Sequence, residues 1–182
     1  MLEIRFDSRG GQGGVIAGKL LAVAVFKEGK HVQAFPTFGV ERRAAPVMAF
    51  VRIDDRPIRI RTQIYNPDHI IILDQSLLQM VDVTQGLKSG ATILINTEKR
   101  PEDFHFDGDF KVVTIDASRI AVEHGLGSVT QPIVNTAILG AVSKVLRVAK
   151  IESIVDAIME EVPAKAQANA AAAREAYEAA EG

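Results

Sequence analysis

Short apolar runs alternate with helix-like segments along this sequence of 182 residues. A first strand is indicated at 2–6, where apolar and charged residues alternate, and helical spacing follows at 15–27 and again from Pro132 onward. Three later runs are apolar on both faces, as in buried parallel strands, at 69–74, 91–96 and 110–116. Strands that alternate with helices predict an α/β fold, a three-layer Rossmann-like domain with a mostly parallel sheet and a helical C-terminus.

The middle of the chain departs from this alternation, because strand-like segments at 31–35, 47–53 and 58–62 have no helical pattern between them. The last two are joined through the turn-forming tetrapeptide DDRP, which predicts an antiparallel hairpin inserted into the sheet. The alanine-rich tail 164–181 has strong helix propensity but a narrow apolar stripe. We expect the helix of this tail to lie on another subunit.

Size and composition are those of one globular domain, which we place at 1–182. With 47% hydrophobic residues the chain can bury a sizeable core, and its net charge of −2 gives no attraction to nucleic acid. No apolar run approaches the roughly 18–20 residues of a membrane span, and the first residues lack the basic-then-apolar order of a signal peptide. These patterns predict a cytoplasmic protein that binds neither nucleic acid nor membrane.

The sequence contains no cysteine, which excludes disulfides, thiolate nucleophiles and cysteine-held iron–sulfur clusters within this chain. The histidines lack the mutual spacing typical of metal ligands, at positions 31, 69, 105 and 124. We therefore predict no metal site in this chain. Asp74 and Asp116 end apolar strands, where a carboxylate most often caps the following helix.

The stretch DSRGGQGG, residues 7–14, places four glycines in five positions between the first strand and the first helix. A loop at the carboxyl end of a parallel strand lies where ligands bind, and the N–H groups of a helix N-terminus attract anions. The dinucleotide pattern G-x-G-x-x-G is not met, because Ile16 stands at the last glycine position, and no GxxxxGK[ST] run occurs. Spacing alone leaves two interpretations, an anion-binding loop and a tight strand-to-helix turn.

A second candidate site is the loop GVERRAAP, in which Glu41, Arg42 and Arg43 follow one another. Two guanidinium groups can bind a phosphate or carboxylate through paired hydrogen bonds, and a neighbouring glutamate can hold one of them in place. The alternatives are a solvated loop with local ion pairs and a salt bridge to another subunit. Further arginines, at 52, 56, 59 and 61, are predicted to lie on a solvated or partner-facing surface.

Four motifs occur in the order and spacing of one known family: RGGQGG at 9–14, FPTFGVERRAAPVMAFVRIDDRPI at 35–58, PDHIIILD at 67–74 and PIVNTAILGA at 132–141. Together they resemble the gamma subunit, or the corresponding internal domain, of the 2-oxoacid:ferredoxin oxidoreductases, and most closely that of the pyruvate enzyme. The resemblance extends from about Ile4 to the tail AREAY at 173–177.

The resemblance implies a subunit of a larger enzyme, without a complete active site of its own. Enzymes of this family decarboxylate a 2-oxoacid on thiamine diphosphate, pass electrons through iron–sulfur clusters to ferredoxin and transfer the acyl group to coenzyme A, reversibly. The complex is expected to use thiamine diphosphate, magnesium, iron–sulfur clusters and coenzyme A, none of them bound by this chain alone. The expected partners are alpha-, beta- and delta-type subunits, with ferredoxin reached through the complex and homodimers formed by the isolated chain.

Individual residues are assigned where they match the family motifs, and none is assigned a catalytic role. The expected contacts to coenzyme A or to other subunits are Gly10, Gly11, Gln12 and Gly13 of the GGQG loop, together with Glu41, Arg42 and Arg43. Asn135 is expected to be a buried amide that binds loop backbone. Ser8 and Ala44 stand where the family usually has glycine.

Other functions are compatible with the same residues. The first is the gamma subunit of a 2-oxoglutarate or branched-chain 2-oxoacid enzyme. The second is an independent module that binds a nucleotide or coenzyme A through the glycine loop. The third is a structural adaptor, whose partners lose assembly but not their chemistry without it.

Overall fold

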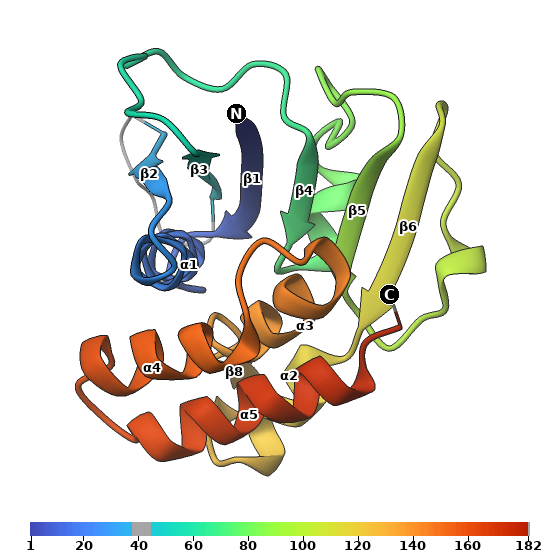
Figure 1. Ribbon diagram of the computed structural model, residues 1–182. Coiled ribbons are helices and arrows are strands. Elements are labelled where there is room, and N and C mark those ends of the chain that lie inside the picture. The colour runs from blue at the N-terminus through green and yellow to red at the C-terminus, as the bar shows by residue number, and fades with distance from the viewer. Residues whose placement is uncertain (38–44, 182) are drawn as a thin grey trace.

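The computed structural model describes residues 1–37 and 45–181, which build a six-stranded sheet in the order β2-β3-β1-β4-β5-β6 (Figure 1). The strands are β1 (Leu2–Arg9), β2 (His31–Pro36), β3 (Pro46–Asp54), β4 (His69–Ile72), β5 (Ala91–Asn96) and β6 (Phe110–Ile115). β1, β4, β5 and β6 run parallel, whereas β3 is antiparallel to both β1 and β2. The mostly parallel α/β sheet expected from the sequence is confirmed.

The predicted hairpin between 47–53 and 58–62 is wrong, because 58–62 forms no strand. β3 pairs with β1 through Leu2 and Ile53 on one side, and with β2 through His31 and Asp54 on the other. A strand has only two hydrogen-bonding edges, so none is left on β3 for the segment that follows it. The inserted antiparallel pair is therefore formed by β2 and β3.

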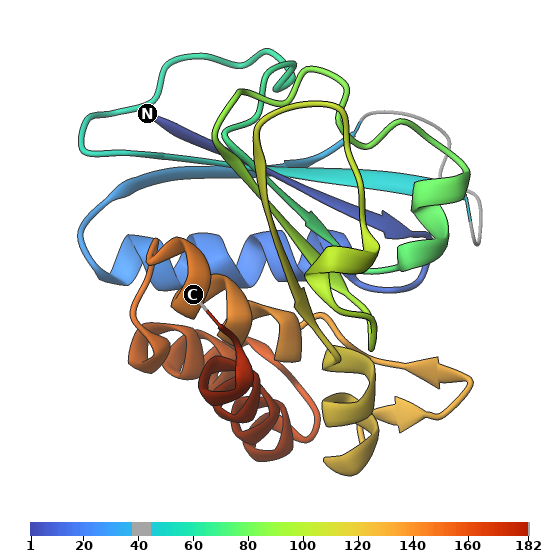
Figure 2. The ribbon, with the colours of Figure 1, turned by 90° about the vertical axis from the view of Figure 1, so that its right-hand side faces the viewer.

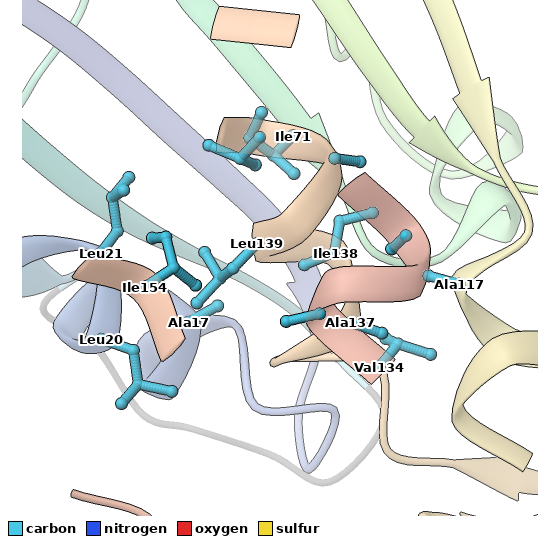
Figure 3. Packing of buried hydrophobic residues seen from close by; sticks show 14 of the residues in the cluster. Ala17, Leu20, Leu21, Ile71, Ala117, Val134, Ala137, Ile138, Leu139 and Ile154 are labelled. Atoms are coloured by element: carbon cyan, nitrogen blue, oxygen red, sulfur yellow. The ribbon is translucent and has the colours of Figure 1, made fainter. Parts of the chain in front are cut away.

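The α-helices lie on one face of the sheet (Figure 2). They are α1 (Gly14–Lys27), α2 (Ala117–Glu123), α3 (Ala137–Leu146), α4 (Ile151–Glu161) and α5 (Ala166–Ala179). Figure 3 shows the core on this face, where Leu21 of α1, Leu139 of α3 and Ile154 of α4 belong to the same buried cluster as Ile71 of β4. Burial of these side chains supplies the hydrophobic stabilisation of the helical layer.

Loops and two short 3-10 helices, η1 (Gln75–Gln79) and η2 (Pro101–Asp103), cover the opposite face of the sheet. Successive residues of a strand point to opposite faces, so Ile70 and Ile72 pack under this layer, whereas Ile71 faces the helices. Both faces of β4 are thus buried. This is why β4 is apolar from Ile70 to Ile72.

The alanine-rich helix α5 packs on α3 and α4 of its own chain, so the prediction that it lies on another subunit is wrong. A Cβ atom added at Gly140 of α3 would lie 1.8 Å from the carbonyl oxygen of Ala173 in α5. The two backbones approach too closely for any side chain at position 140. Four alanines of α5, at 170, 172, 173 and 176, are buried.

A small hairpin of β7 (Gly127–Ser128) and β8 (Gln131–Pro132) joins α2 to the segment before α3 and extends away from the helices (Figure 2). The sequence patterns gave no signal for it, because each strand has two residues and no apolar alternation. In the described ranges, no helix combines the length and the hydropathy needed to cross a membrane.

Candidate functional site

A cleft of about 970 Å³ lies at the carboxyl ends of the parallel strands. The glycine loop after β1 forms one wall, and the β7–β8 hairpin forms another. The floor is formed by residues that follow β4, β5 and β6, among them Asp74, Asn96 and Asp116. Ligands of open α/β sheets bind in this position. The cleft is therefore the candidate site.

Two glycines of the loop have left-handed backbone angles, which favour glycine. Gly11 has a φ of +95°, and a Cβ there would meet no atom of residues 1–37 or 45–181 within 4 Å. Gly13, the N-cap of α1, has a φ of +81°, and a Cβ there would lie 2.5 Å from Nδ2 of Asn135. The positive φ angles at Gly11 and Gly13 thus form a tight strand-to-helix turn. At Gly13 the turn also packs closely against Asn135.

The backbone of the same loop leaves donors available at the N-terminus of α1. Gly10 N–H donates to the carbonyl of Ala45 over 2.9 Å, and Gln12 N–H donates to the carbonyl of Arg9 over 3.0 Å. The N–H groups of Gly11 and Gly13 have no hydrogen-bond partner within residues 1–37 and 45–181. Free N–H groups beside a helix N-terminus suit an anion. The anion-binding interpretation and the tight turn are therefore compatible.

The side chain of Gln12 is bound within its own chain. Its Oε1 accepts a 2.7 Å hydrogen bond from the backbone N–H of Arg9, and its Nε2 donates a 2.6 Å bond to Oδ2 of Asp74. The amide thereby links the end of β1 to the residue after β4. Gln12 fixes the shape of the loop, which positions the backbone N–H groups at the cleft.

The Asp74 carboxylate interacts with several groups beside the glycine loop. Its Oδ1 accepts a 2.9 Å bond from the N–H of Ser76 at the start of η1, and its Oδ2 lies 3.7 Å from Nη1 of Arg9. Burial acts to raise the pKa of the Asp74 carboxyl, but bonds from Ser76 and Gln12 and the charge of Arg9 outweigh it and lower that pKa. The carboxyl is held as a carboxylate.

Capping by both predicted aspartates is confirmed. Asp74 is the N-cap of η1, and Asp116 is the N-cap of α2, where its Oδ1 accepts a 2.8 Å bond from the N–H of Arg119. Both residues also border the cleft. Capping and proximity to the cleft therefore coincide, since the carboxyl ends of the strands meet the helix N-termini at this edge.

Asn96 and Ser118 belong to the site and were not predicted. Asn96 Nδ2 donates to the carbonyl of Leu73 and to Oγ of Ser118, each over 2.9 Å, and Asn96 Oδ1 accepts the N–H of Ser118 over 3.1 Å. These bonds hold the ends of β4, β5 and α2 together. The available signal was the polar residue at the end of the apolar run ATILIN, the same signal that identified Asp74.

Asn135 lies behind the glycine loop and is 7% exposed, so its expected burial is confirmed. Its amide packs on Gly13, but it forms no hydrogen bond to the described loop backbone, and that part of the prediction is wrong. Oδ1 of Asn135 is buried without a hydrogen-bond partner among the described residues. An unpaired buried acceptor is costly and is often found at a functional site.

Glu41, Arg42 and Arg43 lie outside the described residues. The residues that flank this segment are placed: Thr37 N–H donates to the carbonyl of Met48 over 2.8 Å, and Ala45 accepts the bond from Gly10. Residue 45 is thus placed beside the glycine loop, and residue 37 lies beside β3.

Arg52 does not belong with the exposed arginines, and its predicted solvation is wrong. Its side chain is buried in β3, where Nε donates over 2.8 Å to Oε1 of Glu3, and its guanidinium lies 5.2 Å from the ring centre of Phe35. In the described part of the chain, no group of three or more His, Cys, Asp or Glu side chains is arranged to hold a metal ion.

Comparison with known proteins agrees with this architecture. The family model described as pyruvate ferredoxin/flavodoxin oxidoreductase matches residues 3–179. "Pyruvate/ketoisovalerate oxidoreductases common subunit gamma" of Thermococcus litoralis is 54% identical over 182 residues, covering 98% of this chain and 96% of the relative. "Pyruvate synthase subunit PorC" of Methanothermobacter thermautotrophicus is 51% identical over 179 residues, covering 98% and 95%.

A solved structure has the same fold. The crystal structure of pyruvate oxidoreductase subunit PORC from Thermotoga maritima is similar, with a TM-score of 0.82 and 33% sequence identity. The match covers 99% of this chain and 97% of that one. The likeness therefore extends over the whole fold, including the glycine loop and the C-terminal helices.

Proposed function

This chain belongs to the pyruvate ferredoxin/flavodoxin oxidoreductase family, and we propose that it is the gamma subunit of a multi-subunit 2-oxoacid:ferredoxin oxidoreductase. The observation that carries the proposal is the 54% sequence identity to a protein described as a gamma subunit, over 98% of this chain. The assembled enzyme converts pyruvate, coenzyme A and oxidised ferredoxin to acetyl-coenzyme A, carbon dioxide and reduced ferredoxin, reversibly.

The gamma subunit is not the part that selects the 2-oxoacid. The Thermococcus litoralis relative is described as common to pyruvate and ketoisovalerate oxidoreductases, so one gamma chain serves two acids. Pyruvate is the proposed substrate because the Methanothermobacter relative is described as a pyruvate synthase subunit. A 2-oxoglutarate or branched-chain acid is the alternative that the assay below separates.

The cofactors of the reaction belong to the other subunits. The absence of cysteine fits a chain that leaves the iron–sulfur clusters to its partners. The proposed contact of this chain is to the phosphates of coenzyme A, through the N–H groups of Gly11 and Gly13 at the start of α1. Gly10 and Gln12 hold the loop, and Glu41, Arg42 and Arg43 are proposed to complete the contact.

The cleft also supports a second candidate, an independent module that binds a nucleotide or coenzyme A. Its size and its free N–H groups favour this reading. The two candidates differ in what the isolated chain does. The independent module binds coenzyme A without other proteins, whereas the gamma subunit binds it only in the assembled enzyme. Titration calorimetry of the isolated chain with coenzyme A separates them.

The proposal is tested by anaerobic purification of the tagged chain from its native cells. The preparation is assayed for coenzyme-A-dependent, viologen-reducing decarboxylation of pyruvate, 2-oxoglutarate and ketoisovalerate. We expect co-purification of thiamine- and cluster-containing subunits and activity with pyruvate. A homogeneous protein without partners or activity would overturn the assignment, and activity with another acid alone would correct the substrate.

A further inference from the structure

The segment that connects β3 to β4 carries exposed arginines at positions 56, 59 and 61. It is anchored at both sides: Gln33 of β2 donates to the carbonyl of Ile58 over 3.3 Å, and Asp68 N–H donates to the carbonyl of Glu3 over 2.7 Å. We call residues 56–61 the arginine segment. It is a fixed part of the surface that the function proposed above does not use.

The arginine segment has no counter-charge among the residues that the structure describes. Within residues 1–37 and 45–181, none of its guanidinium groups lies within ion-pair distance of a carboxylate. The neighbouring acids are already paired with other cations: Asp54 with the N-terminal ammonium at 3.1 Å, Asp55 with Lys30, and Asp68 with Lys88 at 2.7 Å. Three exposed positive charges therefore lie within six residues of one another.

Apolar side chains are exposed on the same connection. Ile60 is 45% exposed between Arg59 and Arg61, and Tyr65 is 71% exposed. The stretch 56–67 contains no lysine and no acidic residue. Arginine and tyrosine are enriched in protein interfaces, whereas lysine is depleted there. The composition is that of a protein-binding surface rather than of a solvated charge cluster.

The arginine segment lies at the opposite end of the sheet from the cleft. β3 ends beside the start of β1, because Ile53 pairs with Leu2, and the connection then leads into the beginning of β4 (Figure 1). The cleft is at the carboxyl ends of β1 and β4. Changes in the arginine segment are therefore separated from the proposed coenzyme A contact by the length of the strands.

We propose that the arginine segment docks a carboxylate-bearing surface of another subunit of the same enzyme, an inference that rests on the proposed function. Guanidinium groups bind carboxylates through paired hydrogen bonds, and the exposed Ile60 and Tyr65 supply apolar contact beside them. Nucleic acid is disfavoured as the occupant, because the chain has a net charge of −2 and the segment only three cations.

The test uses zero-length cross-linking in the assembled enzyme. Arginine does not react with a carbodiimide, but the variant Arg59→Lys/Arg61→Lys places amines that the reagent couples to an adjacent carboxylate. We expect peptide mapping to show links from positions 59 or 61 to aspartate or glutamate of a partner subunit. The matched control, Arg174→Lys on the exposed face of α5, is expected to give no such link.

Charge reversal gives an independent measurement. We expect Arg59→Glu/Arg61→Glu to weaken incorporation into the complex at least about tenfold, with a reduced dependence on salt, whereas Arg147→Glu/Arg174→Glu assembles as the native chain does. Circular dichroism and a thermal melt of each isolated chain verify that it is folded. Equal incorporation of both variants, or cross-links only within this chain, would overturn the docking proposal.

The outcomes distinguish this inference from the function on which it rests. If the native chain fails to assemble with the alpha-, beta- and delta-type subunits, the proposed function is wrong. If it assembles but the arginine segment neither cross-links nor responds to charge reversal, the docking surface alone is wrong. The docking proposal would also be overturned if the native chain bound a fluorescent single-stranded oligonucleotide and Arg59→Glu/Arg61→Glu did not.

Discussion

Gln12 Nε2 and Asp74 Oδ2, from residues 62 positions apart in the sequence, are joined by a 2.6 Å hydrogen bond. Gln12 belongs to the glycine loop after β1, and Asp74 caps η1 after β4. Because Asp74 is a carboxylate, the bond is charge-assisted and stronger than one between neutral groups. It fixes the glycine loop to the sheet edge that forms the cleft.

Replacing Gln12 by alanine is expected to raise the KM for coenzyme A of the assembled enzyme about 3- to 10-fold. The loss of this bond weakens the ordering of the loop by about 1 kcal/mol, while the backbone donors remain. Steady-state kinetics with coenzyme A as the varied substrate measure this. The control is Gln167→Ala on the exposed face of α5. An unchanged KM in Gln12→Ala would show that the bond from Gln12 to Asp74 does not position a contact to coenzyme A.

Two glycines of the loop are expected to differ in their tolerance of a methyl group. Gly11→Ala should cost about 1 kcal/mol, because the positive φ is unfavourable while no described residue lies within 4 Å of the new methyl group. Gly13→Ala should cost about 3 kcal/mol or more, since its Cβ also collides with the Asn135 amide at 2.5 Å. Urea unfolding of the isolated chains measures both. Equal costs would contradict the described packing of Asn135 against the loop.

The stabilising effect of Asp74 should depend on pH. Its folded-state pKa is lowered, so its contribution is present above the unfolded value of 3.8 and is lost as pH falls through the folded pKa. We expect Asp74→Asn to be less stable than the native chain by about 1–2 kcal/mol near neutral pH. The difference should shrink between about pH 5 and pH 3.

Urea unfolding across this range measures the difference, with the exposed Asp107→Asn as the control variant. A native-to-variant difference that stays constant with pH would mean that the Asp74 carboxyl is not held as a carboxylate by Ser76, Gln12 and Arg9. The native chain and the variant are compared at each pH because the contributions of their shared carboxylates to the unfolding free energy cancel in the difference.

Helix contacts predict opposite effects at two helical glycines. Gly140→Ala should destabilise the chain by about 3 kcal/mol or more, because the new methyl overlaps the Ala173 carbonyl of α5. Gly18→Ala in α1 should be neutral or stabilising by up to about 1 kcal/mol. Its Cβ meets Val51 Cγ2 at an ordinary 3.4 Å, and alanine favours the helix. The midpoints of thermal unfolding report both changes. A stable Gly140→Ala chain would contradict the close α3–α5 contact.

The sequence by itself determined the fold class and the placement of the glycine loop at the carboxyl end of β1. The runs HIIILD and ATILIN are apolar on both faces because β4 and β5 are covered by helices on one side and by the η1 and η2 layer on the other. The glycine loop between β1 and α1 followed from the same alternation. Asp74 was recognisable because a carboxylate after an apolar strand can cap the next helix. These are local signals, readable within a few residues.

Tertiary structure decided which segments meet. The pattern IRIRT is compatible with a strand, but both edges of β3 are already paired, so the segment stays outside the sheet. Arg52 and Arg59 look alike in the sequence, yet only Arg52 is buried, beside Glu3 from another strand. Helix α5 packs through Ala173 on Gly140 of the same chain. Such outcomes depend on contacts between residues far apart in the sequence, which no local pattern of apolar and charged residues contains.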